Sequence, residues 1–85
     1  MVAGRWAVTP GRWYRLGDNC PVFVVRIETR AGYSVMRGLR LQRDGVVQMQ
    51  TYQYRQACRM VLVPRPDGGD VVEARALNDY GLVAR

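Results

Sequence analysis

Polar and hydrophobic residues alternate most clearly between residues 22 and 30, as expected for a β-strand with one face in the core. The odd positions are Phe23, Val25, Ile27 and Thr29, and the even positions are Val22, Val24, Arg26, Glu28 and Arg30. Because successive side chains of a strand point to opposite faces, this pattern predicts a buried odd face and an even face that becomes polar toward the end of the strand.

Four further segments have the pattern of short strands separated by turns rich in Gly, Pro and Asp. They cover residues 12–16, 33–43, 46–54 and 59–63. Within the second of these, Arg37 interrupts an otherwise apolar parity, and Gly38 follows it directly. A glycine inside a strand is typical of a β-bulge, so we expect a bulge in this segment that turns Arg37 outward.

The connections between these segments are short. Residues 17–19, 31–32 and 43–45 are typical of tight turns, and residues 55–57 form a brief break before the last strand. Five short antiparallel strands connected in this way resemble the Src-homology-3 topology, a small and partly open barrel. No diagnostic motif of a named family accompanies the resemblance. The predicted fold class is therefore mainly β, with the barrel formed by residues 1–66.

Residues 67–85 are predicted to be a C-terminal appendage that packs on the barrel or trails from it. Asp70 is a candidate N-cap, and Glu73 three residues later would complete a capping box. The alternation of apolar and charged residues over 72–76 would also suit an extra strand. A short helix through about Asn78 is favoured, because Ala-rich segments without β-branched runs prefer the helix.

The length of 85 residues indicates one domain. No apolar run approaches the roughly 18–20 residues of a membrane span, and the N-terminus lacks the apolar stretch of a secretory signal. We therefore expect a cytoplasmic protein without a membrane partner. Cys20 and Cys58 are expected to be small buried hydrophobes, and the sequence leaves open whether they form a disulfide.

All thirteen basic residues are arginine, and their distribution is uneven. Residues 1–66 hold eleven Arg against three acidic residues, whereas residues 67–85 hold two Arg against four. A GC-rich genome would favour Arg over Lys, but it encodes Asp and Glu equally well and so does not account for the net charge of +6. Since arginine grips phosphate and carboxylate groups in a bidentate manner, the body of the chain is expected to bind an anionic partner.

The chain lacks the usual groups of catalytic and metal sites. Without histidine, and with only two distant cysteines, it offers no zinc or haem site. The absence of lysine removes Schiff-base chemistry, and the absence of histidine removes the commonest general base. Neither glycine pattern of a phosphate-binding loop is present. We therefore expect a non-enzymatic protein that uses no cofactor.

One parity of the strand at 46–54 carries amides followed by phenols. With the even-numbered arginines of the preceding strands, these side chains would form a surface for phosphates, base stacking and base edges. The candidate nucleic-acid-binding residues are Arg26, Arg30, Arg40, Gln48, Gln50, Tyr52 and Tyr54, assisted at the edge by Arg12 and Arg15, with Trp6 as a stacking candidate. In the plainer interpretation this is a solvated sheet face on which the tyrosines pack against arginine stems.

The same residue types also suit a protein partner, because Tyr, Trp, Arg and Met are enriched in interface cores. The alternative function is a protein-binding module or small inhibitor, of phage or plasmid type, that engages an acidic protein, and a homodimer joined through edge strands would fit as well. In a separate hypothesis, the acidic residues at 67–85 cover the basic face within the same chain and limit unspecific binding. On that hypothesis, their deletion strengthens polyanion binding.

Overall fold

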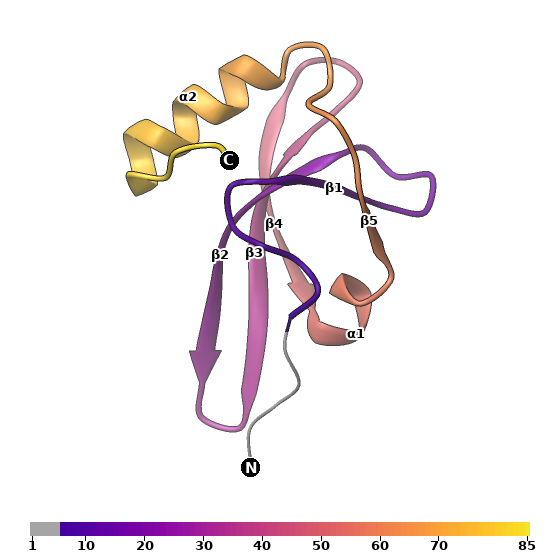
Figure 1. Ribbon diagram of the computed structural model, residues 1–85, viewed down its shortest axis with the longest axis vertical. Helices are drawn as coiled ribbons and strands as arrows, with labels where there is room; N and C mark the ends of the chain where they lie inside the picture. The colour runs from indigo at the N-terminus through magenta and orange to yellow at the C-terminus, as the bar shows by residue number, and fades with distance from the viewer. Residues whose placement is uncertain (1–5) are drawn as a thin grey trace.

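A computed structural model describes residues 6–85 as a mainly β chain with two helical segments (Figure 1). The elements are β1 (Trp13–Leu16), β2 (Val22–Arg30), β3 (Tyr33–Leu41), β4 (Val47–Gln53), α1 (Tyr54–Ala57), β5 (Met60–Leu62) and α2 (Gly69–Tyr80). Each of the five predicted strands is confirmed, with ends that differ by no more than two residues. The short break predicted before the last strand is the helical turn α1.

The five strands form one antiparallel sheet in the order β4-β3-β2-β1-β5. The sheet does not close, because β4 pairs only with β3 and β5 pairs only with β1. The long β2–β3 hairpin runs the length of the molecule, and β1 crosses it at an angle in Figure 1.

The predicted β-bulge is present at the expected level of the sheet, but the extra residue lies in the neighbouring strand. Val24 pairs with Gly38, and Arg26 pairs with Arg37, so Val25 is the additional residue and belongs to β2 rather than β3. A β-carbon at Gly38 would clash with Cγ2 of Val22 and lie 3.2 Å from the carbonyl oxygen of Phe23. The glycine is therefore needed for close packing of the two strands beside the bulge.

The predicted alternation along β2 is only partly confirmed, because Val22 to Val25 are all buried where both faces of the sheet are covered. Beyond Val25 the bulge reverses the alternation, so Ile27 packs against the same cluster as Val24. Val22 and Val24 belong to one hydrophobic cluster, together with Tyr14, Met36, Val8 and Ala57 of α1. Phe23 and Val25 belong to a second cluster on the other face, together with Trp13, Leu39, Val72 and Ala76 of α2. Both faces of the sheet are thus covered, one by α1 and the N-terminal segment and the other by α2.

The C-terminal helix favoured by the sequence is confirmed, but its predicted capping box is wrong. The N-cap is Gly68, which has a left-handed backbone (φ 81°), and Asp70 lies inside the first turn. Glu73 turns toward the sheet instead, where one carboxylate oxygen accepts a hydrogen bond from Nε1 of Trp13 (2.9 Å) and the other from Arg65 (3.2 Å). Since α2 contributes buried residues, deleting residues 67–85 would expose the core and would not test whether the acidic segment covers a binding face.

Replacing Glu73 with alanine is expected to destabilise the protein by about 1.5–3 kcal/mol, because the buried indole N–H of Trp13 loses a charged acceptor. The matched control on the same helix is Asp79→Ala, which removes an exposed ion pair with Arg75 and should cost about 0.3–0.5 kcal/mol. Urea unfolding of the two variants measures the difference, and equal midpoints would show that the Trp13–Glu73 bond does not hold α2 on the sheet.

Within residues 6–85, no helix has both the length and the apolar character needed to cross a membrane. Cys20 and Cys58 are both free thiols, and Cys58 is exposed rather than buried as the sequence suggested.

Candidate anion-binding surface

The predicted binding residues lie on two different faces of the sheet. Residues directly opposite each other on neighbouring antiparallel strands share a face. Arg40 pairs with Gln48 and with the buried Val22, so these residues lie on the face of the first hydrophobic cluster. Arg26 pairs with Arg37 on the opposite face, because the bulge at Val25 lies between it and the start of β2. Arg30 is the last residue of β2 and pairs with Tyr33.

The arginines near the middle of the β2–β3 hairpin are occupied by an acidic neighbour. Glu28 accepts an ion pair from Nη2 of Arg26 at 2.7 Å and another from Nε of Arg37 at 3.0 Å. The Glu28 side chain is only 14% exposed, so these contacts are partly shielded from solvent. Glu28 therefore engages both arginines, and its one negative charge offsets one of their two positive charges.

The two tyrosines of the predicted stacking surface are not side by side in a solvent-exposed row. Tyr52 pairs with the buried Met36 and packs against the first cluster, and its burial raises the pKa of its phenol, although the charge of Arg40 opposes the shift. Tyr54 is the first residue of α1, where its ring meets that of Trp6 edge to face at 5.0 Å. A hydrogen bond with Cys58 raises the pKa of Tyr54.

The predicted glutamines of β4 interact mainly with one another. The amides of Gln42 and Gln50 both donate to the side-chain oxygen of Gln48. The row is on the same face as Arg40, which confirms that the even positions of this strand and Arg40 share a face.

Four arginines without an ion-pair partner among residues 6–85 lie around the β1–β2 turn. We call Arg15, Arg40, Arg43 and Arg59 the turn-side arginines; none of them forms an ion pair with any residue in the described part of the chain. They line three adjoining shallow hollows of about 440, 400 and 370 Å³, and Asp18 and Asn19 border all three. This end of the sheet therefore holds the largest group of uncompensated charge that the contacts define.

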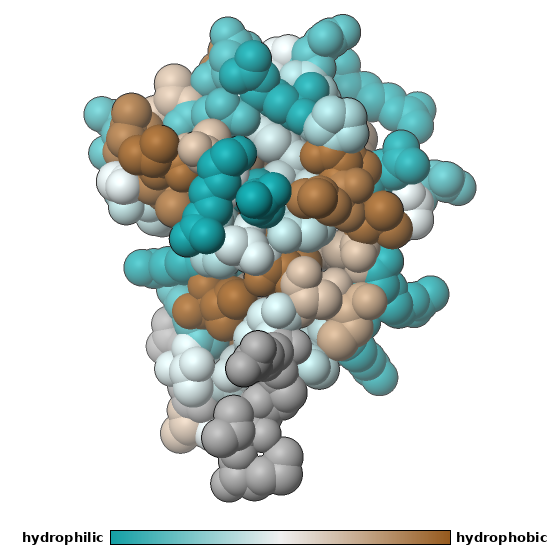
Figure 2. All heavy atoms as spheres, in the orientation of Figure 1, coloured by the Kyte–Doolittle hydropathy of each residue, from teal (hydrophilic) through white to brown (hydrophobic). Residues whose placement is uncertain are grey.

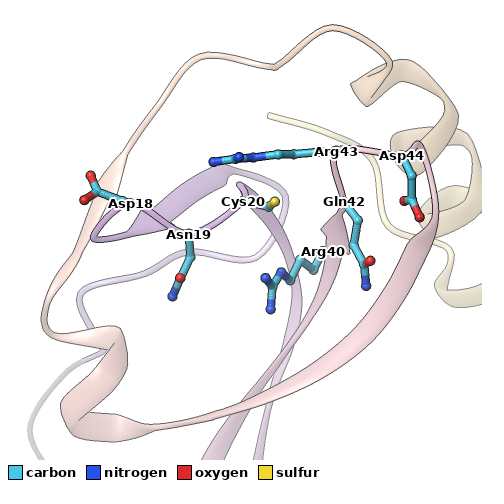
Figure 3. A pocket seen from close by; sticks show the side chains of 7 residues that line it. All are labelled: Asp18, Asn19, Cys20, Arg40, Gln42, Arg43 and Asp44. Atoms are coloured by element: carbon cyan, nitrogen blue, oxygen red, sulfur yellow. The ribbon is translucent and has the colours of Figure 1, made fainter.

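Acidic residues also border these hollows, but they do not neutralise the arginines directly. Asp44 is held in the β3–β4 turn, where its carboxylate accepts a hydrogen bond from the backbone N–H of Val46 at 3.0 Å. In Figure 3, Arg40 and Arg43 extend from the end of β3 toward the β1–β2 turn, whereas the carboxylate of Asp18 points away from Arg40. Anionic groups thus have access to the arginines from the solvent side.

Arg15 and Arg40 are among the residues predicted from the sequence to bind a ligand, whereas Arg43 and Arg59 are not. The signal that identifies Arg43 was available: in an antiparallel hairpin the start of β2 lies beside the end of β3, so the turns at 17–19 and 43–45 are neighbours. Arg59 comes close only because the sheet returns through α1 to place β5 beside β1. Arg12 lies elsewhere, in a hollow of about 410 Å³ with Trp13, Arg65 and Arg85.

In residues 6–85 no group of three or more His, Cys, Asp or Glu side chains is placed to hold a metal ion. No protein-family model matches the chain, and neither a curated protein nor a solved structure matches it.

Proposed function

We propose that this protein is a non-enzymatic, single-stranded nucleic-acid-binding protein whose turn-side arginines contact successive phosphates. The observation that carries the proposal is that four arginines without ion-pair partners line adjoining hollows at one end of the sheet. A polymer with a regular row of anions matches charges spread over several shallow hollows better than a single small anion does. The side-chain amide of Asn19 borders the same hollows and can donate to or accept from exposed base edges.

The strand arrangement supports a Src-homology-3-like fold as part of this proposal. A five-stranded antiparallel sheet with β1 between β2 and β5, and a helical turn between β4 and β5, is what we expect of such a partly open barrel. Small barrels of this kind bind nucleic acid through their loops and sheet edges without needing a deep cavity.

The proposal is tested by fluorescence anisotropy with labelled single-stranded and duplex oligonucleotides of the same sequence, at 50 and 200 mM salt. We expect the single strand to bind more tightly, with an affinity that falls about fiftyfold between the two salt concentrations if all four arginines contact phosphates. Failure to bind either oligonucleotide at 50 mM salt would contradict the proposal.

The second candidate is a protein-binding module for an acidic partner, and the exposed β5 strand favours it. Val61 and Leu62 are 62% and 55% exposed on a strand that pairs only with β1, and Figure 2 shows apolar atoms gathered over this side of the molecule, at the right. An open edge strand can add a strand from another chain. Poly-glutamate represents an acidic protein in the titration, and tighter binding to it than to the single strand would replace the leading proposal.

A further inference from the structure

The hollow of about 440 Å³ between the β1–β2 turn and the end of β3 contains an unusual donor. Nε of Arg40 is buried and has no hydrogen-bond partner in the described structure. Buried donors are nearly always paired, because water cannot replace the missing acceptor. The side chain leaves the sheet beside the fully buried Val22 and points into this hollow (Figure 3).

We propose that this hollow is a binding site for one phosphate group, with Arg40 at its base and Arg43 at its rim. We call it the phosphate site. The inference deepens the proposed function, and it depends on that function only in assigning the phosphate to a nucleic-acid strand. A guanidinium also presents its two terminal nitrogens as parallel donors, which match two oxygens of a phosphate. Arg43 approaches from a different position on the same border and can contact another oxygen of the tetrahedral group.

The surroundings of the hollow favour a weak, selective site. Gln42 already donates to Gln48, and the backbone N–H of Asn19 already donates to Leu16, so neither of these donors is available. Asp18 and Asp44 on the border repel every anion and lower the affinity. A planar carboxylate has two oxygens and can pair with only one guanidinium at a time in a bidentate manner. A tetrahedral phosphate has further oxygens for a second arginine, so two arginines in different positions favour phosphate.

The phosphate site is tested by NMR, by titrating the ¹⁵N-labelled full chain with inorganic phosphate at constant ionic strength. The side-chain Nε–H signals of arginine report binding. The Arg40 signal should shift and saturate at millimolar phosphate, whereas the signal of Arg26 should not follow it. Acetate is the carboxylate control. An Arg40 signal that does not respond to phosphate, or that responds equally to acetate, would overturn the proposal.

Two variants give independent evidence. Arg40→Lys keeps the charge but removes the fork, and it should weaken phosphate binding at least tenfold, with the backbone amide spectrum confirming that the fold is retained. Asp18→Asn removes a charge from an exposed side chain, and it should strengthen binding about twofold. Wild-type affinity for phosphate in both variants would contradict a phosphate site at Arg40.

Oligonucleotides with a 5′-phosphate or a 5′-hydroxyl identify the source of the phosphate. Equal shifts of the Arg40 signal with both support an internal phosphate, and a shift with the phosphorylated strand alone supports a terminal one. If inorganic phosphate binds but neither oligonucleotide does, the phosphate site is supported and the proposed nucleic-acid binding is contradicted. If the oligonucleotides bind without shifting the Arg40 signal, nucleic-acid binding is supported and the phosphate site is contradicted.

Discussion

Gly38→Val is expected to lower the free energy of unfolding by about 3 kcal/mol or more, at the upper end of the range for overpacked cores. Even a single β-carbon at this position clashes with Cγ2 of Val22, which is only 1% exposed. The neighbouring carbonyl of Phe23, at 3.2 Å from that β-carbon, belongs to the backbone of β2 and has little room to move. Valine adds two further methyl groups to the same space.

The measurement is urea unfolding, with Gln48→Val as the control. Gln48 is exposed on β4, so valine at that position should change the stability by no more than about 0.5 kcal/mol. Similar midpoints for Gly38→Val and the wild type would mean that β2 and β3 do not approach each other as closely beside the bulge as the structure indicates.

The same bulge explains why the strands were predictable and the faces were not. The strands follow from local signals, namely alternation and turn residues at 17–19, 31–32 and 43–45. The faces depend on the register, and one extra residue reverses them. Four consecutive apolar residues, Val22 to Val25, give no sign of which one is extra. Gly38 marked the correct level of the sheet, but a glycine marks close packing as readily as it marks a bulge in its own strand.

This reversal also changed which arginines belong together. Arg26 and Arg40 have the same parity in sequence and would share a face in a regular sheet, yet the bulge separates them. Glu28 pairs with Arg26 and Arg37 in the folded state, and no local signal in the sequence predicts either ion pair. An arginine is available for a ligand only if no acidic residue occupies it, and that property depends on tertiary contacts.

Exposed arginines with and without an acidic partner should therefore differ in their effect on binding. The double variant Arg15→Gln/Arg43→Gln should weaken single-stranded oligonucleotide binding about 25-fold at 0.1 M salt, since each lost phosphate contact is worth about fivefold there. The slope of log K against log salt concentration should become shallower by about 1.4 in this variant. Both residues are exposed and make no ion pair with the described residues, so the fold should tolerate the change.

The matched control is Arg26→Gln/Arg75→Gln, which removes the same net charge from arginines that already pair with Glu28 and Asp79. Its affinity should fall by no more than about threefold, through the general loss of positive charge. Anisotropy titrations of both variants and the wild type at several salt concentrations give the comparison. If the two double variants weaken binding equally, the protein attracts polyanions through its net charge alone. That outcome would leave no role for the turn-side arginines as a group. The proposed surface therefore requires that Arg15→Gln/Arg43→Gln loses more affinity than the control variant.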